Sequence, residues 1–107
     1  MKYTQLGQSK IKISQFALGC WPFAGGELWG DQNDSDSIDA VNESIENGIN
    51  FFDTAPGYGE GRSEEVLGKA LIKKRQSSII GTKVPPSDLS PKNIRKACEE
   101  SLKRLKT

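Results

Sequence analysis

The chain of 107 residues has the length of one small domain, and its 35% hydrophobic and 27% charged residues suit a folded globular protein rather than a disordered one. Its 15 basic and 14 acidic side chains give a formal net charge of +1, which provides no reason to expect a nucleic-acid or membrane partner. No apolar run approaches the roughly 20 residues that span a bilayer, and the polar N-terminus lacks the apolar core of a signal peptide, so a cytoplasmic location is expected.

The predicted elements begin with a hairpin over residues 2–13, where apolar and polar side chains alternate on either side of a turn at Gly7. A first strand–loop–helix unit follows at about residues 16–47. It starts with the apolar run Phe16–Gly19, as expected for a strand covered on both faces, and continues into a Gly-rich loop at residues 24–33. Apolar residues then recur at helical spacing: Ile38, Val41 and Ile45.

The second unit, at about residues 49–73, starts with the strand Ile49–Asp53 and continues into a Gly-rich loop at residues 55–61. Ser63 is expected to cap the next helix, with two acidic residues in the first turn. The buried stripe of that helix is expected to be Val66, Leu67, Ala70 and Leu71.

The third unit, at about residues 78–106, starts with the strand Ser78–Val84. Ser90 followed by Pro91 is typical of a helix N-terminus. The apolar face of this helix is expected to comprise Ile94, Ala97, Cys98, Leu102 and Leu105. Strands alternate with helices throughout, so the fold class is α/β with a parallel sheet and crossover helices.

A candidate site lies at the carboxyl ends of the strands, where α/β folds bind their ligands. Asp53 and Lys83 end neighbouring strands and can pair, and Tyr58 lies in the loop after Asp53. An ammonium beside a phenol favours the phenolate and so helps the phenol to transfer a proton near neutral pH. An ordinary ion pair and a packing tyrosine fit the same spacing, so the residues alone leave both interpretations open.

The cysteines and the absence of histidine limit other chemistries. With no histidine, the chain offers neither histidine-based catalysis nor histidine-ligated metal, and no metal is expected. Cys20 and Cys98 match no metal spacing. Cys98 is expected to be a buried thiol, and Cys20 lies near the candidate site without a visible base beside it.

A joint pattern of motifs runs over essentially the whole chain. Asp53–Gly59 reads Asp-Thr-Ala-Pro-Gly-Tyr-Gly and is followed by Ser63–Leu71; Lys83 follows Thr82; and Leu18–Trp21 ends the first strand. With the N-terminal hairpin, this pattern resembles the aldo-keto reductase family. The Trp29-Gly30 loop is most similar to the bacterial subgroup related to potassium-channel β-subunits.

The resemblance implies a fold and a reaction. The fold is the N-terminal hairpin plus three βα units of a (β/α)8 TIM barrel, truncated, so that residues 1–107 form a partial barrel domain. The family binds NADPH, with NADH as the less frequent cofactor, and no G-x-G-x-x-G fingerprint occurs here. The substrate is a small aldehyde or ketone: Tyr58 would deliver the proton to its oxygen, and Lys83 and Asp53 would tune that phenol.

The resemblance also implies contacts to cofactor and substrate. The cofactor would lie against Gly19, Cys20, Trp21 and Asp53. The substrate pocket would comprise Trp21, Trp29 and Tyr58, although Trp29 equally fits an ordinary loop anchor.

The chain departs from the family pattern in one respect. The family's fourth catalytic residue, a histidine after the fourth strand, has no counterpart here, nor do the downstream residues that grip the adenosine phosphate. We therefore expect the isolated chain to be inactive. The alternative function is a non-catalytic, truncated barrel fragment that acts through self-association or partner binding. A weaker third reading, nucleic-acid binding, would use a basic helix face that two glutamates interrupt: Lys92, Arg95, Lys96, Lys103, Arg104 and Lys106.

Overall fold

A three-stranded parallel sheet carries the candidate site. The computed structural model describes residues 1–87 and 89–107. Strands β3 (Leu18–Gly19), β4 (Phe51–Asp53) and β5 (Ile79–Gly81) pair in the order β3-β4-β5. The parallel pairing and the helices between the strands confirm the predicted fold class.

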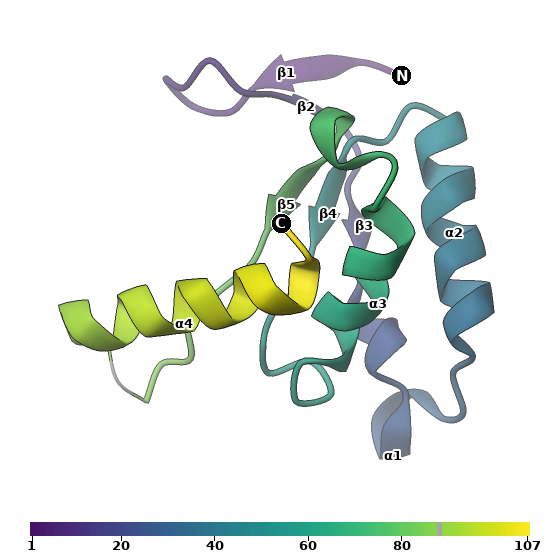
Figure 1. Ribbon diagram of the computed structural model, residues 1–107. Helices are drawn as coiled ribbons and strands as arrows, with labels where there is room; N and C mark the ends of the chain where they lie inside the picture. Colours follow the sequence, from purple (N-terminus) through teal and green to yellow (C-terminus); the bar gives the residue numbers. More distant parts are fainter. Residues whose placement is uncertain (88) are drawn as a thin grey trace.

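The hairpin forms a separate antiparallel pair, β1 (Tyr3–Gln5) with β2 (Lys12–Ser14). It lies across the end of the sheet where β3, β4 and β5 begin (Figure 1). Hydrogen bonds attach it there: Asn50 accepts from the Ser14 backbone N–H at 2.7 Å and donates to the Lys12 carbonyl at 3.0 Å. The opposite end of the sheet is therefore left for the candidate site.

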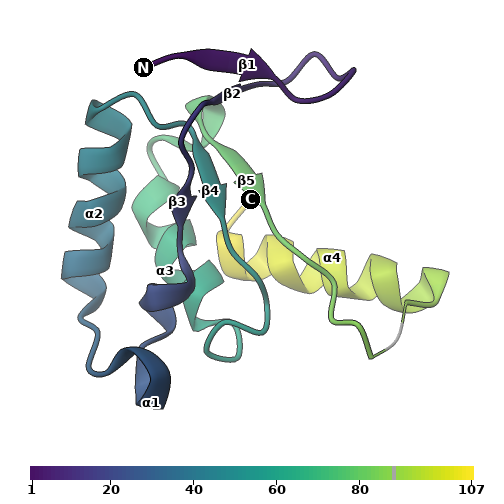
Figure 2. The same cartoon turned by 180° about the vertical axis from the view of Figure 1, so that it is seen from behind.

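The helices all cover one face of the sheet. They are α2 (Asp34–Glu46), α3 (Arg62–Leu71) and α4 (Pro91–Leu105), with the short elements η1 (Trp21–Ala24), α1 (Gly26–Trp29) and η2 (Arg75–Ser77) between them. Figure 2 shows that no helix of the described residues lies over the other face of β3, β4 and β5. The sheet is thus half covered.

The core lies between the sheet and the helices. Phe52 of β4 is fully buried, and its register partners Leu18 and Ile80 pack against the same cluster. The cluster comprises Cys20, Phe23, Val41, Phe52, Val66, Leu67, Leu71 and Leu105. Because side chains alternate along a strand, Asp53, next to Phe52, is directed to the bare face.

The helix termini confirm some of the predicted caps. Ser90 caps α4 by accepting a hydrogen bond from the Asn93 backbone N–H at 3.3 Å. The predicted cap of α3 is wrong, since α3 begins at Arg62 and its N-cap is Gly61, with φ +95°. Ser63 is instead fully buried, and its hydroxyl donates to the Cys20 carbonyl at 2.7 Å.

Two further predictions fail for reasons of packing. The Gly-rich segment 24–33 is not entirely a loop, because it holds the short helix α1. Cys98 is exposed rather than buried, and Ile94 and Leu102 of the same face are each 42% exposed. Only the C-terminal end of α4 packs on the core, through Leu105, and the rest extends past β5 (Figure 1).

Candidate active site

Lys83, two residues after β5, is the centre of the site. Its ammonium donates to Asp53 Oδ1 at 2.7 Å, to the Thr54 carbonyl at 2.9 Å and to the Tyr58 hydroxyl at 3.3 Å. These three acceptors match the three N–H bonds of an ammonium. The structure therefore brings the predicted carboxylate, phenol and ammonium together at the carboxyl ends of β4 and β5.

The charge on Lys83 is stabilised by these contacts. Partial burial works against the ammonium, but the hydrogen bonds and charges of Asp53 and Tyr58 prevail and raise the pKa of Lys83. The side chains of Lys83 and Asp53 are each about half exposed. Lys83 thus stays protonated beside the phenol in a site that is open to solvent.

An aromatic group stands beside the phenol. The Trp21 ring stacks on Tyr58 with centroids 5.4 Å apart and planes 18° apart, and Trp29 meets Trp21 edge-on at 5.6 Å. Trp21 is 45% exposed and Trp29 is 43% exposed. The three predicted pocket residues therefore form one continuous wall with a free surface, although they come from η1, α1 and the loop after β4.

Buried hydroxyl groups tie the strand ends to α3. The hydroxyls of Thr54 and Ser63 share a hydrogen bond of 2.9 Å, and Ser63 donates to the Cys20 carbonyl. The Cys20 N–H in turn donates to the Asp53 carbonyl at 2.8 Å. The sequence pattern indicated neither bond, although Thr54 directly follows Asp53 and so stands where its hydroxyl can bond near the strand end.

Cys20 and Gly19 have different environments. Cys20 is fully buried, and this burial, with a smaller effect of the Asp53 charge, raises the pKa of its thiol to about 12. The thiol therefore remains protonated at neutral pH and is unsuited to act as a nucleophile. Gly19 is exposed, with nothing within 4 Å of the position a Cβ would take, so its backbone is open to a ligand.

An apolar hollow adjoins Lys83. Its volume is about 200 Å³, and its walls are Ala55, Pro56, Gly57, Lys83, Val84, Pro85 and Pro86. A ligand group placed there would lie within reach of the ammonium. No sequence motif indicated this hollow, because prolines that follow a strand usually indicate only where the strand ends.

Solved structures share this arrangement of strands and helices. The aldo-keto reductase AKR11C1 of Bacillus halodurans in its holo form superposes with a TM-score of 0.85 at 32% identity, over 100% of this chain and 37% of that one. An aldo-keto reductase of Klebsiella pneumoniae in complex with NADPH gives 0.80 at 29% identity, over 90% and 32%. The fold of the chain thus matches part of the barrel of these aldo-keto reductases.

The family follows from the sequence comparison. The model of the "Aldo/keto reductase family" matches residues 15–107, and the chain belongs to that family. The aldo-keto reductase YhdN of Bacillus subtilis is 37% identical over 100% of this chain and 35% of its own length. The NADH-specific methylglyoxal reductase of Escherichia coli is 36% identical over 98% and 38%.

The predicted subgroup is also represented among the relatives. An Arabidopsis thaliana protein with the name "Probable voltage-gated potassium channel subunit beta" is 36% identical over 98% of this chain and 34% of its own length. The chain therefore spans about a third of the length of the curated relatives it matches. Within residues 1–87 and 89–107, no helix combines the length and apolar character needed to cross a membrane.

Proposed function

We propose that this chain supplies the proton-donating part of a nicotinamide-dependent carbonyl reductase. The observation that carries the proposal is the Lys83 ammonium, which bridges the Asp53 carboxylate and the Tyr58 hydroxyl at strand ends. An isolated ion pair would need no phenol at its ammonium. A phenol held there has the position that proton transfer requires.

The steps of these residues follow from their contacts. Tyr58 donates its proton to the oxygen of an aldehyde or ketone, and the nearby charge of Lys83 stabilises the phenolate that remains. Asp53 holds that ammonium in place. A bound nicotinamide cofactor supplies the hydride.

The residues at the site fit such a cofactor. Trp21 presents a half-exposed ring, Gly19 an open backbone and Asp53 a carboxylate, all at the carboxyl ends of β3 and β4. We propose NADPH as the cofactor and NADH as the alternative, because one similar structure holds NADPH and one similar enzyme is NADH-specific. Trp29 and the apolar hollow beside Lys83 would contact the substrate.

A chimaera with a similar enzyme tests the proposal. This chain would replace the matching N-terminal segment of the 37% identical YhdN, and NADPH oxidation would be followed with a panel of small aldehydes and ketones. We expect carbonyl-dependent oxidation, reduced by about 10²-fold or more by Tyr58→Phe. A folded, nucleotide-binding chimaera without activity would contradict the proposal.

The isolated chain provides the second test. We expect it to lack turnover, since about a third of each relative's length is present. Fluorescence titration with NADPH measures whether these residues bind the cofactor alone. Rapid carbonyl-dependent oxidation that Tyr58→Phe abolishes would show that the chain needs nothing further.

A second candidate function is association through the uncovered surfaces. Among the described residues, no helix covers the second face of the sheet (Figure 2). Ile94 and Leu102 of α4 are exposed. The edges of β3 and β5 have one neighbouring strand each. Light scattering on the purified chain tests this function: a dimer or larger species would support it, and a monomer at high concentration would contradict it.

A further inference from the structure

A buried carboxylate lies behind the site, and the proposed reaction does not use it. Glu64 is in the first turn of α3 and is fully buried. Its Oε2 accepts from Arg104 Nε of α4 at 2.5 Å, and its Oε1 accepts from the Thr82 hydroxyl at 2.6 Å. A buried charge is costly to desolvate, and an exposed pair would join α3 to α4 without that cost. The burial therefore indicates a further role.

Thr82 connects this carboxylate to the site. It lies directly before Lys83 and directly after β5. Its hydroxyl reaches Glu64 on the helix-covered side of the sheet, whereas Lys83 reaches Asp53 and Tyr58. Neighbouring side chains of an extended chain point to opposite sides, so a bond that holds one of them also sets the direction of the other.

We propose that Glu64 is a positioning residue: through Thr82 it fixes the end of β5 so that the Lys83 ammonium stays between Asp53 and Tyr58. Arg104 orients the carboxylate from the side opposite Thr82, since an ion pair with a hydrogen bond has a defined geometry. The inference rests on the proposed function only in treating Lys83 as part of the reaction machinery.

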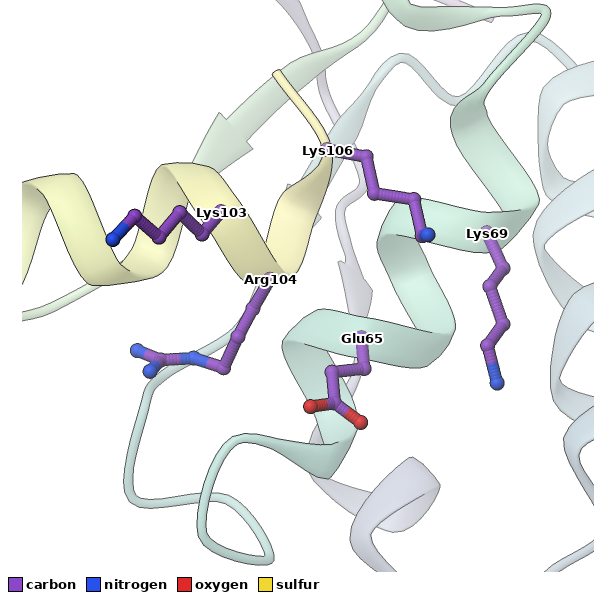
Figure 3. Close-up of a pocket in the computed structure, with 5 residues that line it drawn as sticks. All are labelled: Glu65, Lys69, Lys103, Arg104 and Lys106. Carbon is purple, nitrogen blue, oxygen red and sulfur yellow. The ribbon is translucent and has the colours of Figure 1, made fainter.

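The neighbouring acid does not share this arrangement. Glu65 is exposed and lines a solvent-filled hollow of about 370 Å³ between α3 and α4, with Lys69, Lys103, Arg104 and Lys106. In Figure 3 the Glu65 carboxylate and the Arg104 guanidinium lie well apart. Glu65 is therefore a matched control for Glu64: the same side chain, one position further along the same helix turn.

The test measures the chemical reactivity of Lys83 in the 107-residue chain. Each lysine is acylated briefly at mildly alkaline pH and quantified by peptide mass spectrometry, with the other lysines as internal references. Thr82→Val removes the hydroxyl and keeps the shape. We expect Lys83 to react about threefold faster, because the loosened ammonium loses contact with the acceptors that raise its pKa, so that more of it is present as the free amine. Thr82→Ser retains the hydroxyl and should react like the parent chain.

Controls separate positioning from general loosening. Asn33→Ala removes the α2 cap, in which the Asn33 side chain accepts from the Ser35 N–H, and destabilises the chain without removing a hydrogen bond of Glu64, Thr82 or Lys83. Equal Lys83 reactivity in Thr82→Val and the parent, or an equal rise in Asn33→Ala, would overturn the proposal. Glu64→Gln should follow Thr82→Val, and Glu65→Gln should follow the parent. If Glu64→Gln fails to fold, the comparison of Thr82→Val with Thr82→Ser still tests the proposal.

The outcome is independent of the reductase assay. An inactive chimaera together with a reactive Lys83 in Thr82→Val would reject the proposed function and leave the positioning role standing. An active chimaera whose Lys83 reactivity does not change in Thr82→Val would support the proposed function and reject the positioning role.

Discussion

Gly68→Ala is a substitution whose sign the structure decides. Gly68 lies buried within α3 at the contact with α4. In a helix interior, alanine is favoured over glycine by about 1 kcal/mol, so local propensity predicts a more stable chain. A Cβ at Gly68, however, would lie 2.7 Å from the Arg104 carbonyl oxygen and 2.8 Å from the Leu105 backbone.

The size of the destabilisation depends on which atoms must move to make room for the added methyl group. The crowded atoms belong to the backbone of α4, so no side-chain rotation relieves the contact and the helix itself must shift. Overpacking of this kind costs about 1–3 kcal/mol, and a displaced α4 also weakens the pair of Arg104 with Glu64. Because backbone atoms must move, we take the upper half of that range, about 2–3 kcal/mol; after the propensity gain of about 1 kcal/mol is subtracted, we expect a net loss of about 1–2 kcal/mol in the free energy of unfolding.

Urea denaturation followed by circular dichroism measures this loss. Gly57→Ala is the control, because nothing lies within 4 Å of its added methyl group and the backbone there does not need glycine. The control should change stability by less than about 0.5 kcal/mol. A Gly68→Ala chain at least as stable as the parent would refute the reasoning, since it would show that α3 and α4 are further apart.

Three more predictions concern charge and thiols. Arg104→Ala leaves the carboxylate of Glu64 buried without its ion-pair partner, and urea denaturation should show a loss of about 3–5 kcal/mol. Hydrogen bonds from the cations Arg62 and Lys69 lower the pKa of Asp34 below 3.8. The Asp34 carboxylate therefore stabilises the fold fully above pH 3.8, and this stabilisation is lost as the pH falls through the lowered pKa. Urea titrations at several pH values should show a weaker acid dependence of stability in Asp34→Asn. A thiol reagent should label exposed Cys98 in the native chain, and Cys20 only after unfolding, because burial holds its thiol protonated.

Much of the fold could be predicted because each strand is a short apolar run with a distinct end. β4 and β5 form inside the predicted segments, and Asp53 and Lys83 stand where parallel pairing places them. The meeting of these two side chains with Tyr58 followed from topology, since strand ends of one parallel sheet share an edge.

Several features that the sequence did not predict depend on contacts between distant segments. Ser63 has the residue type of a cap, yet the buried Cys20 carbonyl, 43 residues away, takes its hydroxyl. Glu64 falls on the same helix face as Leu67 and Leu71, so the spacing carried a signal of burial that its charge obscured. Thr82 could not be assigned as its partner, because no local pattern reports which acid a threonine will reach across the fold.

The apolar face of α4 is largely exposed, whereas the hydrogen bonds of the site are already formed. Ile94 and Leu102 lie on one apolar stripe with Leu105, but the sheet reaches only the last of them. A partner that covers this stripe would stabilise the chain and would add its own surface beside α4. The ammonium needs no such cover, because its acceptors Asp53, Thr54 and Tyr58 belong to β4 and the loop after it. Association at α4 would therefore leave the hydrogen bonds of the Lys83 ammonium as they are.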